Sequence, residues 1–159
     1  MAAGRITKSN SSDEAPILLV KQPDSSFRLF IDYRALNYVI VKNRNRLPLM
    51  TELRERLNTA KVFTKLDLKN RYHLVRMAEE DEEKTAFHTR FRLYHWRVIP
   101  FGLCNASAMF QSIMNHIFHD LLDIRVIVHL YNLLIYNENV DKHIPLIQEV
   151  LSRLDKASL

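Results

Sequence analysis

Residues 126–136 read VIVHLYNLLIY, and we expect the rest of the chain to fold around this stretch. Two short apolar runs, rich in β-branched residues, flank a polar pair formed by Tyr131 and Asn132. This pattern predicts a buried β-hairpin with a tight turn between its strands. Asn tolerates the left-handed backbone that such turns need. The sequence therefore predicts a hairpin at the centre of a sheet, which presents Tyr131 and Asn132 from a rigid part of the molecule.

The composition indicates a globular protein without a membrane span. The chain has 159 residues, of which 47% are hydrophobic, and this suits one domain or two interleaved subdomains. No apolar run reaches the ~18–20 residues of a membrane span, and residues 1–14 contain no apolar signal core. We therefore expect an intracellular protein with no signal peptide, no transmembrane segment and a flexible N-terminal segment over residues 1–14. The compartment stays open.

Positive charge is concentrated in the first half of the chain. The net charge is +5, and it divides into +4 over residues 1–60, +2 over residues 61–120 and −1 over residues 121–159. A basic first half fits a polyanionic partner such as nucleic acid. A solvated surface gives the same count, so charge alone does not select a function.

Patterns that suggest a metal site built from side chains alone are weak. Cys104 is the only cysteine, which excludes a disulfide framework and a cysteine-based zinc site, and we expect it to be an ordinary core residue. Residues 79–83 form a run of carboxylates, which we interpret as a solvated turn or helix start because adjacent residues do not converge on one point. His116 and His119 lack a third ligand, so we expect them to face solvent.

Strands and turns alternate through the first two thirds of the chain. Residues 15–20 and 27–32 are predicted strands of a hairpin, joined by the turn sequence KQPDSS. A helix is expected to begin at Pro48, with Met50, Leu53 and Leu57 on one side. Further strands are predicted over residues 62–68 and 72–77, and a second hairpin over residues 85–91 and 94–99.

Two amphipathic helices are predicted in the last third. The first covers residues 106–122, with Asn105 as its N-cap and an unbroken apolar face. The second covers residues 140–154, and its inward residues are expected to be Val140, Ile144, Ile147, Leu151 and Leu154. Short strands mixed with helices indicate an α+β fold.

From about residue 15 to residue 154, the chain resembles the reverse transcriptase domain of Gypsy-class LTR retrotransposons. The resemblance rests on several stretches in the family's order and spacing: PILLVKQPD, FRLFIDYRALN, LPLMTELRERL, AKVFTKLDLK, YHLVRMAEED, EKTAF, IPFGLCNASAMFQ and LLIY. It implies a fold of fingers (about 15–42 and 76–104) and palm (about 43–75 and 105–159). It also implies a partial domain in which the thumb is absent, since no segment matching the thumb, RNase H or integrase follows.

The family catalyses nucleotidyl transfer with two Mg²⁺ or Mn²⁺ ions, held ~3.5–4 Å apart by carboxylates. The resemblance assigns one metal ligand to Asp67, and it assigns the two remaining aspartates to Tyr131 and Asn132. A phenol with a pKa near ~10 and an uncharged amide replace those two carboxylates. We therefore predict that the metal ions are not productively bound and that polymerase chemistry is lost.

The resemblance also implies a nucleotide site for an incoming dNTP beside an RNA or DNA template-primer. Arg28 matches the residue that contacts the triphosphate, and Tyr72 matches the aromatic gate against a ribose 2′-hydroxyl. Phe101 and Gly102 match the segment beneath the nucleotide, and Leu68 follows the remaining aspartate. Judged by residue type alone, Tyr72 and Phe101 are core aromatics and Arg28 is a surface cation.

Other departures from the family suggest a decaying retrotransposon copy. Ser26, Arg71 and Arg92 stand at family glycines, and Ser107 stands at a proline. If those glycines had positive φ, each replacement costs ~1–2 kcal/mol. The resulting hypothesis is an inactive reverse transcriptase domain. Two alternatives stay open: a non-catalytic module with weak nucleic-acid binding, which predicts a steep salt dependence, and a scaffold for protein interactions.

Overall fold

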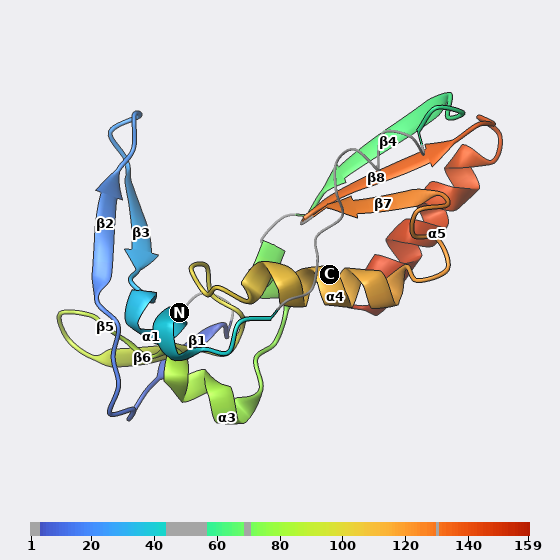
Figure 1. Cartoon of the computed structure of the whole chain (residues 1–159). Helices are drawn as coiled ribbons and strands as arrows, with labels where there is room; N and C mark the ends of the chain where they lie inside the picture. The colour runs from blue at the N-terminus through green and yellow to red at the C-terminus, as the bar shows by residue number, and fades with distance from the viewer. Residues whose placement is uncertain (1–3, 44–56, 69–70, 130) are drawn as a thin grey trace. The chain divides into compact units, whose positions relative to one another are not determined.

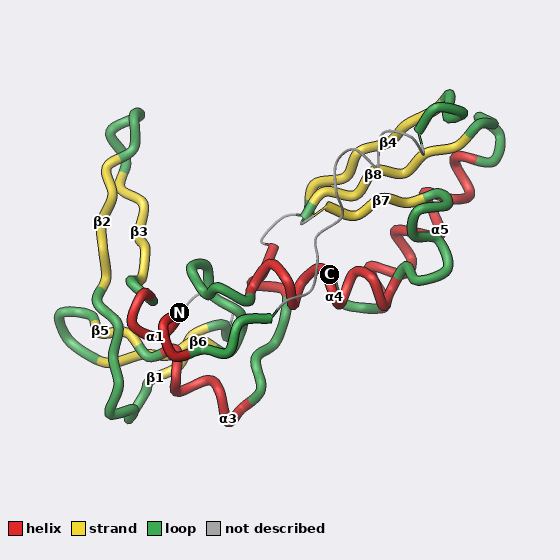
Figure 2. The backbone as a smooth tube through the Cα atoms, in the orientation of Figure 1, coloured by secondary structure: helices red, strands yellow, loops and turns green. Residues whose placement is uncertain are grey.

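A computed structural model describes residues 4–43, 57–68, 71–129 and 131–159 (Figure 1). The chain divides into two compact units. Unit 1 comprises Met1–Lys42 and Tyr72–Ala106, and unit 2 comprises Asn43–Arg71 and Ser107–Leu159. Figure 2 shows the strands and helices of each unit. None of the helices in the described ranges has both the length and the apolar composition that crossing a bilayer requires.

The elements alternate between the two units along the chain. Unit 1 contains β1 (Ile6–Lys8), β2 (Ile17–Lys21), β3 (Phe27–Ile31), α1 (Arg34–Val39), α3 (Glu79–Glu82), the 3-10 helix η2 (Glu83–Thr85), β5 (Phe87–His88) and β6 (Leu93–Trp96). Unit 2 contains β4 (Val62–Asp67), β7 (Val126–His129), β8 (Asn132–Asn137) and α5 (His143–Lys156). The 3-10 helix η1 (Arg71–Leu74) and α4 (Ala106–Ile117) begin at the boundaries. This mixture agrees with the predicted α+β class.

The core of unit 2 lies between an antiparallel sheet, with strand order β4-β8-β7, and the helices α4 and α5. Both helices lie on the same side of the sheet in Figure 1. The Gln111 amide of α4 donates to the Val128 carbonyl, and Thr64 Oγ1 lies 2.8 Å from His143 Nε2 of α5. The buried side chains of these elements include Phe110, Met114, Phe118, Val126, Val128, Leu133, Ile135 and Val150.

The predicted hairpin at residues 126–136 forms as β7 and β8, with two differences from the prediction. Only β8 is central, because β4 pairs with β8; β7 lies at the edge of the described sheet. Asn132 is the first residue of β8, opposite His129, and it does not have a positive φ. The expectation of left-handed backbone at Asn132 was therefore wrong: a strand residue paired on both sides has extended backbone.

Helix α5 forms where it was predicted, but it buries a different face. Its buried residues are His143, Leu146, Val150 and Leu154, and only Leu154 belongs to the predicted set. Of that set, Val140 and Ile144 are each 61% exposed and Leu151 is 48% exposed. The sequence of α5 therefore offers two overlapping faces. The buried one includes His143, whose Nε2 lies 2.8 Å from Thr64 Oγ1 of β4.

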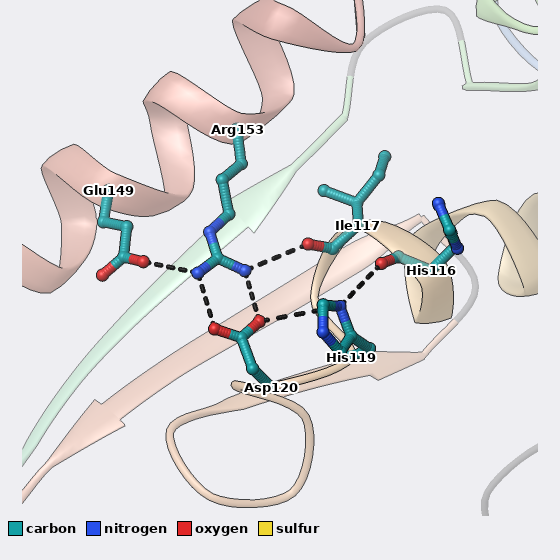
Figure 3. Close-up of polar contacts among 6 residues, drawn as sticks. All are labelled: His116, Ile117, His119, Asp120, Glu149 and Arg153. Carbon is teal, nitrogen blue, oxygen red and sulfur yellow. Dashed lines mark hydrogen bonds and ion pairs between the residues drawn. The ribbon is translucent and has the colours of Figure 1, made fainter.

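Arg153 attaches α5 to the end of α4 (Figure 3). Its guanidinium forms a bidentate ion pair with Asp120, donates to the Ile117 carbonyl at 3.1 Å and also pairs with Glu149. Ile117 is the last residue of α4, where carbonyls lack intrahelical donors. The hydrogen bonds from Arg153 lower the pKa of Asp120 to about 2, and they raise the pKa of Arg153.

Unit 1 is built around a small sheet, with strand order β1-β6-β5, and an aromatic core. Ala15, Tyr33 and Phe87 are buried together, and partly buried aromatic and aliphatic residues pack against them. The Tyr33 hydroxyl donates to the Thr85 carbonyl at 2.8 Å, and burial raises the pKa of that hydroxyl. The β2–β3 hairpin and the helix start at residues 79–83 are confirmed. The β5–β6 hairpin also forms, but its strands are shorter than those predicted over residues 85–91 and 94–99.

Several local predictions differ from the structure. Residues 72–77 were expected to be a strand, but the 3-10 helix η1 occupies the first of them, and the extended part is one bridge between Arg76 and Val98. The short helix α1 was not predicted. It begins where the Asp32 carboxylate accepts a hydrogen bond from the Arg34 backbone amide. The predicted helix from Pro48 lies outside the described residues, apart from Leu57.

One expectation about a single residue was also wrong. Cys104 is exposed and not a core residue. Ser26 and Arg92, which stand at family glycines, do not have positive φ, so the strain considered for those two positions does not arise. At the β2–β3 turn, the left-handed residue is Ser25, with φ 67°, and the Asp24 carboxylate accepts hydrogen bonds from both the amide and the hydroxyl of Ser26.

Candidate functional site

The register of the unit 2 sheet brings the central candidate residues together. Asp67, the last residue of β4, pairs with Asn132, the first residue of β8, and Asn132 pairs in turn with His129 of β7. Side chains alternate along strands, and Leu133 and Ile135 occupy the buried helix-covered face. Asp67 and Asn132 therefore share the opposite face of the sheet, at the end where the β7–β8 turn lies.

The turn itself is tied to the end of β4. The Leu68 amide donates to the Tyr131 carbonyl at 3.1 Å, which continues the β4–β8 ladder one step past Asp67 and Asn132. Asp67 is exposed, whereas Tyr131 and Asn132 are half-buried. The structure thus brings two distant segments together: Asp67 and Leu68 at the end of β4, and Tyr131 and Asn132 at the start of β8.

The donor set at this end of the sheet does not fit a pair of divalent metal ions. Mg²⁺ prefers oxygen ligands and is held in polymerase-type sites by carboxylates together with substrate phosphates. Of the paired residues Asp67 and Asn132, only Asp67 is a carboxylate. Asn132 contributes an amide, and the neighbouring Tyr131 contributes a phenol. Across the described residues, no group of three or more His, Cys, Asp or Glu side chains lies close enough to hold a metal. His116 and His119 are exposed.

The other candidate residues belong to unit 1, where an aromatic cluster surrounds Phe101. The Tyr72 ring meets the Phe101 ring edge-on at 5.4 Å, and the His73 ring lies 4.9 Å from the Phe101 ring and stacks on Trp96 at 4.8 Å. Tyr72 is 9% exposed. Burial, and secondarily the positive charge of Arg5, lower the pKa of His73. Tyr72 and Phe101 are therefore packed residues of unit 1, as residue type alone had indicated.

Gly102 lies in a loop that α1 holds in place. Its φ of 99° is a conformation that L side chains rarely adopt. The Asn37 side chain donates to the Gly102 carbonyl at 2.7 Å and accepts from the Cys104 amide at 2.8 Å. The Asn105 side chain donates to the Val41 carbonyl at 2.9 Å. Asn37 thus bridges the segment that the resemblance placed beneath the nucleotide.

Arg28 lies on the exposed β2–β3 hairpin. It pairs with Val20 across the strands, and its guanidinium lies 5.2 Å from the centroid of the Phe30 ring. The position leaves the guanidinium available to an anion, while the contact with Phe30 limits the directions it adopts.

Two residues with clear structural roles in unit 1 were missed by the sequence analysis: Asn37 and His73. Both lie inside stretches that carried the resemblance, FRLFIDYRALN and YHLVRMAEED. The local signal for the helix is Asp32, whose carboxylate accepts a hydrogen bond from the amide of Arg34, the first residue of α1. Recognising it would have placed Asn37 on a helix.

An aspartate at a strand end, level with the turn of a hairpin on a helix-backed antiparallel sheet, fits the class of polymerase-like domains. Comparison with known families is more specific. Residues 20–159 match the family described as "Reverse transcriptase (RNA-dependent DNA polymerase)". The chain belongs to this family.

Two proteins with similar sequences are retrotransposon polyproteins. The chain is 31% identical over 159 residues to the Transposon Tf2-7 polyprotein of Schizosaccharomyces pombe, covering 100% of this chain and 12% of that protein. It is 38% identical over 161 residues to the Retrovirus-related Pol polyprotein from transposon 297 of Drosophila melanogaster, covering 98% of this chain and 15% of that protein. The chain therefore spans about an eighth of the length of these relatives.

Solved structures with the same fold are viral reverse transcriptases. The foamy viral protease-reverse transcriptase in complex with RNA/DNA hybrid aligns with a TM-score of 0.87 and 23% identity, over 97% of this chain and 20% of that chain. The foamy viral protease-reverse transcriptase dRH in complex with ds DNA aligns with a TM-score of 0.79 and 22% identity, over 97% of this chain and 26% of that chain. At this identity the likeness establishes the fold.

Proposed function

We propose that this chain is a reverse transcriptase domain of the Gypsy class of LTR retrotransposons whose nucleotidyl-transfer site is non-catalytic. In this proposal unit 2 is the palm and unit 1 is the fingers. The observation that carries the proposal is the β4–β8 register, in which Asp67 lies opposite Asn132 and Leu68 bonds to the backbone of Tyr131. The family resemblance implies a carboxylate at each of positions 67, 131 and 132.

The physical reason for inactivity is charge. Two divalent ions bring four positive charges into one cleft, and closely spaced cations need carboxylates to offset their repulsion. Asp67 supplies one negative charge at the aligned positions, and Tyr131 and Asn132 supply none. Lys65 lies on the same face of β4, two residues before Asp67, and adds a positive charge. The net result is a sheet end that repels the second cation.

The palm and fingers assignment is supported by the bounds of the two units. The resemblance divides the chain near residues 42, 75 and 104, and the compact units divide at residues 42, 71 and 106. A palm formed by unit 2 contains Asp67, Tyr131 and Asn132, and fingers formed by unit 1 contain Arg28, Tyr72, Phe101 and Gly102.

The partners proposed for this fold are an RNA or DNA template-primer, a dNTP, and Mg²⁺ or Mn²⁺. Foamy viral protease-reverse transcriptases are described in complex with ds DNA and with RNA/DNA hybrid, which supports a template-primer as the macromolecular partner. Without the two carboxylates, we expect nucleic acid to bind without a productive metal pair.

Primer extension tests the proposal. The chain as it stands is compared with the Tyr131→Asp/Asn132→Asp double variant, on poly(rA) primed with oligo(dT), in Mg²⁺ and in Mn²⁺. We expect no incorporation by the unmodified chain. Extension by the unmodified chain would overturn the proposal, because it would show that Asp67 and the two neutral residues support catalysis.

A direct metal measurement makes the test independent of activity. Bound Mn²⁺ is measured by electron paramagnetic resonance for the unmodified chain, the double variant, and the double variant that also carries Asp67→Asn. We expect Mn²⁺ affinity to rise at least tenfold in the double variant and to fall again when Asp67 is neutralised. Equal Mn²⁺ affinity in all three proteins would show that these positions do not form a metal site.

A second candidate function is a non-catalytic nucleic-acid-binding module. The uneven charge favours it, because residues 1–60 carry a net +4. This candidate predicts binding that weakens steeply with salt and shows little preference for sequence. The third candidate, an interaction scaffold, is supported by the apolar residues exposed on β2 and β3, which include Leu19 at 64% and Phe27 at 66%.

A further inference from the structure

We propose that the β5–β6 turn of unit 1 is a contact site for single-stranded nucleic acid, separate from the nucleotidyl-transfer site in unit 2. The turn contains Arg90 and Phe91, flanked by Thr89 and Arg92, and we call residues 90–92 the Arg-Phe-Arg tip. The inference rests on the proposed function only in taking nucleic acid as the polyanionic partner.

The Arg-Phe-Arg tip is presented by a well-bonded turn. The Thr89 amide donates to the Arg92 carbonyl at 2.9 Å, and the Thr89 hydroxyl donates to the same carbonyl at 2.8 Å. The Thr89 hydroxyl also accepts from the Arg92 amide at 3.1 Å. Behind the turn, Phe87 pairs with Tyr94 and belongs to the buried core of unit 1. The tip is therefore a fixed projection from a packed hairpin.

The side chains of the tip are turned outward. Phe91 is 84% exposed, which leaves nearly all of its ring in water. Arg90 and Arg92 are exposed as well, and the Arg90 guanidinium lies 5.7 Å from the centroid of the Phe91 ring. A ring this exposed contributes little to the core, so its packing does not explain its presence at the turn.

The charges at the tip are unbalanced. Neither Arg90 nor Arg92 forms an ion pair with any residue that the structure describes. Glu14 instead lies 3.5 Å from His88, at the base of the hairpin. Two unpaired guanidinium groups beside an exposed ring attract an anionic partner and retain a face for stacking.

Single-stranded nucleic acid matches this combination. Phosphates bind the guanidinium groups, and an unpaired base stacks on the phenylalanine ring, which a duplex does not allow because its bases are stacked on each other. An acidic peptide satisfies the arginines but leaves the ring uncovered. The site therefore favours a single strand with little sequence preference, since every base has a face that stacks.

Fluorescence anisotropy on the full chain tests the inference, with a labelled 20-nucleotide oligo(dT) and a hairpin duplex of equal charge as probes. We expect Phe91→Ala to weaken binding of the single strand about tenfold, and Phe91→Trp to retain it. The double variant Arg90→Gln/Arg92→Gln is expected to reduce the slope of log affinity against log salt by about 1.4, as two lost phosphate contacts require.

Matched controls separate the tip from general surface effects. Tyr38→Ala removes another exposed aromatic residue of unit 1, 88% exposed, and Arg76→Gln/Lys142→Gln removes the same number of positive charges. Neither control is expected to change single-strand affinity by more than twofold. The inference is overturned if Phe91→Ala and Tyr38→Ala behave alike, if the duplex loses as much affinity as the single strand, or if the unmodified chain does not bind the single strand at low salt.

The outcome is separable from that of the proposed function. The metal measurement on Tyr131→Asp/Asn132→Asp reports on unit 2, whereas the anisotropy measurements on the Phe91 and Arg90/Arg92 variants report on the tip, so either result can fail without the other. Extension by the unmodified chain overturns the inactive-site proposal and leaves the tip inference standing. Loss of vesicle binding in Phe91→Ala, with phosphatidylserine vesicles and unchanged oligo(dT) binding, would instead assign the tip to a membrane surface.

Discussion

The chain contains two apolar hairpins that differ in what covers them. In the β7–β8 hairpin of unit 2, Leu133 and Ile135 are 0% exposed. In the β2–β3 hairpin of unit 1, Leu19 is 64% exposed and Phe27 is 66% exposed. Both hairpins are antiparallel and both have a strongly apolar sequence. The difference is that β8 has a strand on each side and helices against one face, whereas β2 and β3 pair only with each other among the described strands.

The β7–β8 hairpin is held by packing, whereas the β2–β3 hairpin offers an exposed surface. The end of β8 carries Asn132, and its buried neighbours fix the backbone opposite Asp67. The β2–β3 hairpin carries Arg28 on an open two-stranded ribbon, where the side chain is exposed to water. A buried hairpin suits the placement of metal ligands within fractions of an ångström, and an exposed hairpin suits contact with a mobile substrate.

The largest effect on the free energy of unfolding is expected when one leucine in each hairpin is truncated to alanine. Leu133→Ala removes a fully buried side chain from the central strand and should lower the free energy of unfolding by about 2–5 kcal/mol. Leu19→Ala, at a position 64% exposed, should lower it by less than about 0.5 kcal/mol. Urea unfolding followed by circular dichroism measures both. Equal losses would mean that β2 is covered in solution, for example by a second molecule.

A smaller effect is expected at Asn37, which holds the Gly102 loop in unit 1. Asn37→Ala removes the hydrogen bonds to the Gly102 carbonyl and from the Cys104 amide, at an expected cost of about 1–2 kcal/mol. Asn37→Asp keeps the acceptor for the Cys104 amide but sets a carboxylate oxygen against the Gly102 carbonyl oxygen, so its loss should be at least as large as that of Asn37→Ala. Urea unfolding and limited proteolysis of the loop measure the order. Full stability in Asn37→Asp would contradict this assignment.

The smallest effect, and one confined to a pH range, is expected at the link between α4 and α5 in unit 2. The folded-state pKa of Asp120 is lowered to about 2 from its ordinary value of 3.8, chiefly by hydrogen bonds from Arg153. A carboxyl with a lowered pKa stabilises the fold fully above its unfolded value and loses that contribution as the pH falls through its folded value. The melting temperature of Asp120→Asn should therefore lie below that of the unmodified chain above about pH 4, and the two should converge below about pH 2.

Salt and a neighbouring cation provide the controls for that measurement. Lys156→Ala removes a positive charge from the last turn of α5 without touching Asp120, and it should leave the pH dependence unchanged. Because the pair is solvent-exposed, high salt should shrink the difference between Asp120→Asn and the unmodified chain. Asp120 is still partly ionised at pH 2, so only a difference that persists well below pH 2 would show that Asp120 acts through something other than its charge.

Much of the fold was predictable because local patterns and tertiary packing agree. The hairpin at residues 126–136, the strand ending at Asp67 and the helix beginning at Ala106 were all placed correctly from alternation and helical periodicity. Predictions were wrong where two local patterns competed. Residues 72–77 were predicted as a strand, but residues 72–74 belong to the 3-10 helix η1, where the His73 ring stacks on Trp96 and contacts Phe101.

The sequence alone determined the chemistry available at the site. Asp67, Tyr131 and Asn132 are fixed by the gene, and a phenol and an amide do not take the charge of a carboxylate in any fold. The tertiary structure decided which of these residues meet, because pairing of β4 with β8 brings together positions 65 residues apart in the chain. It also decided which apolar face of α5 is buried and which hairpin stays exposed. Those choices depend on contacts between distant segments, such as His143 with Thr64, and local periodicity carries no information about such contacts.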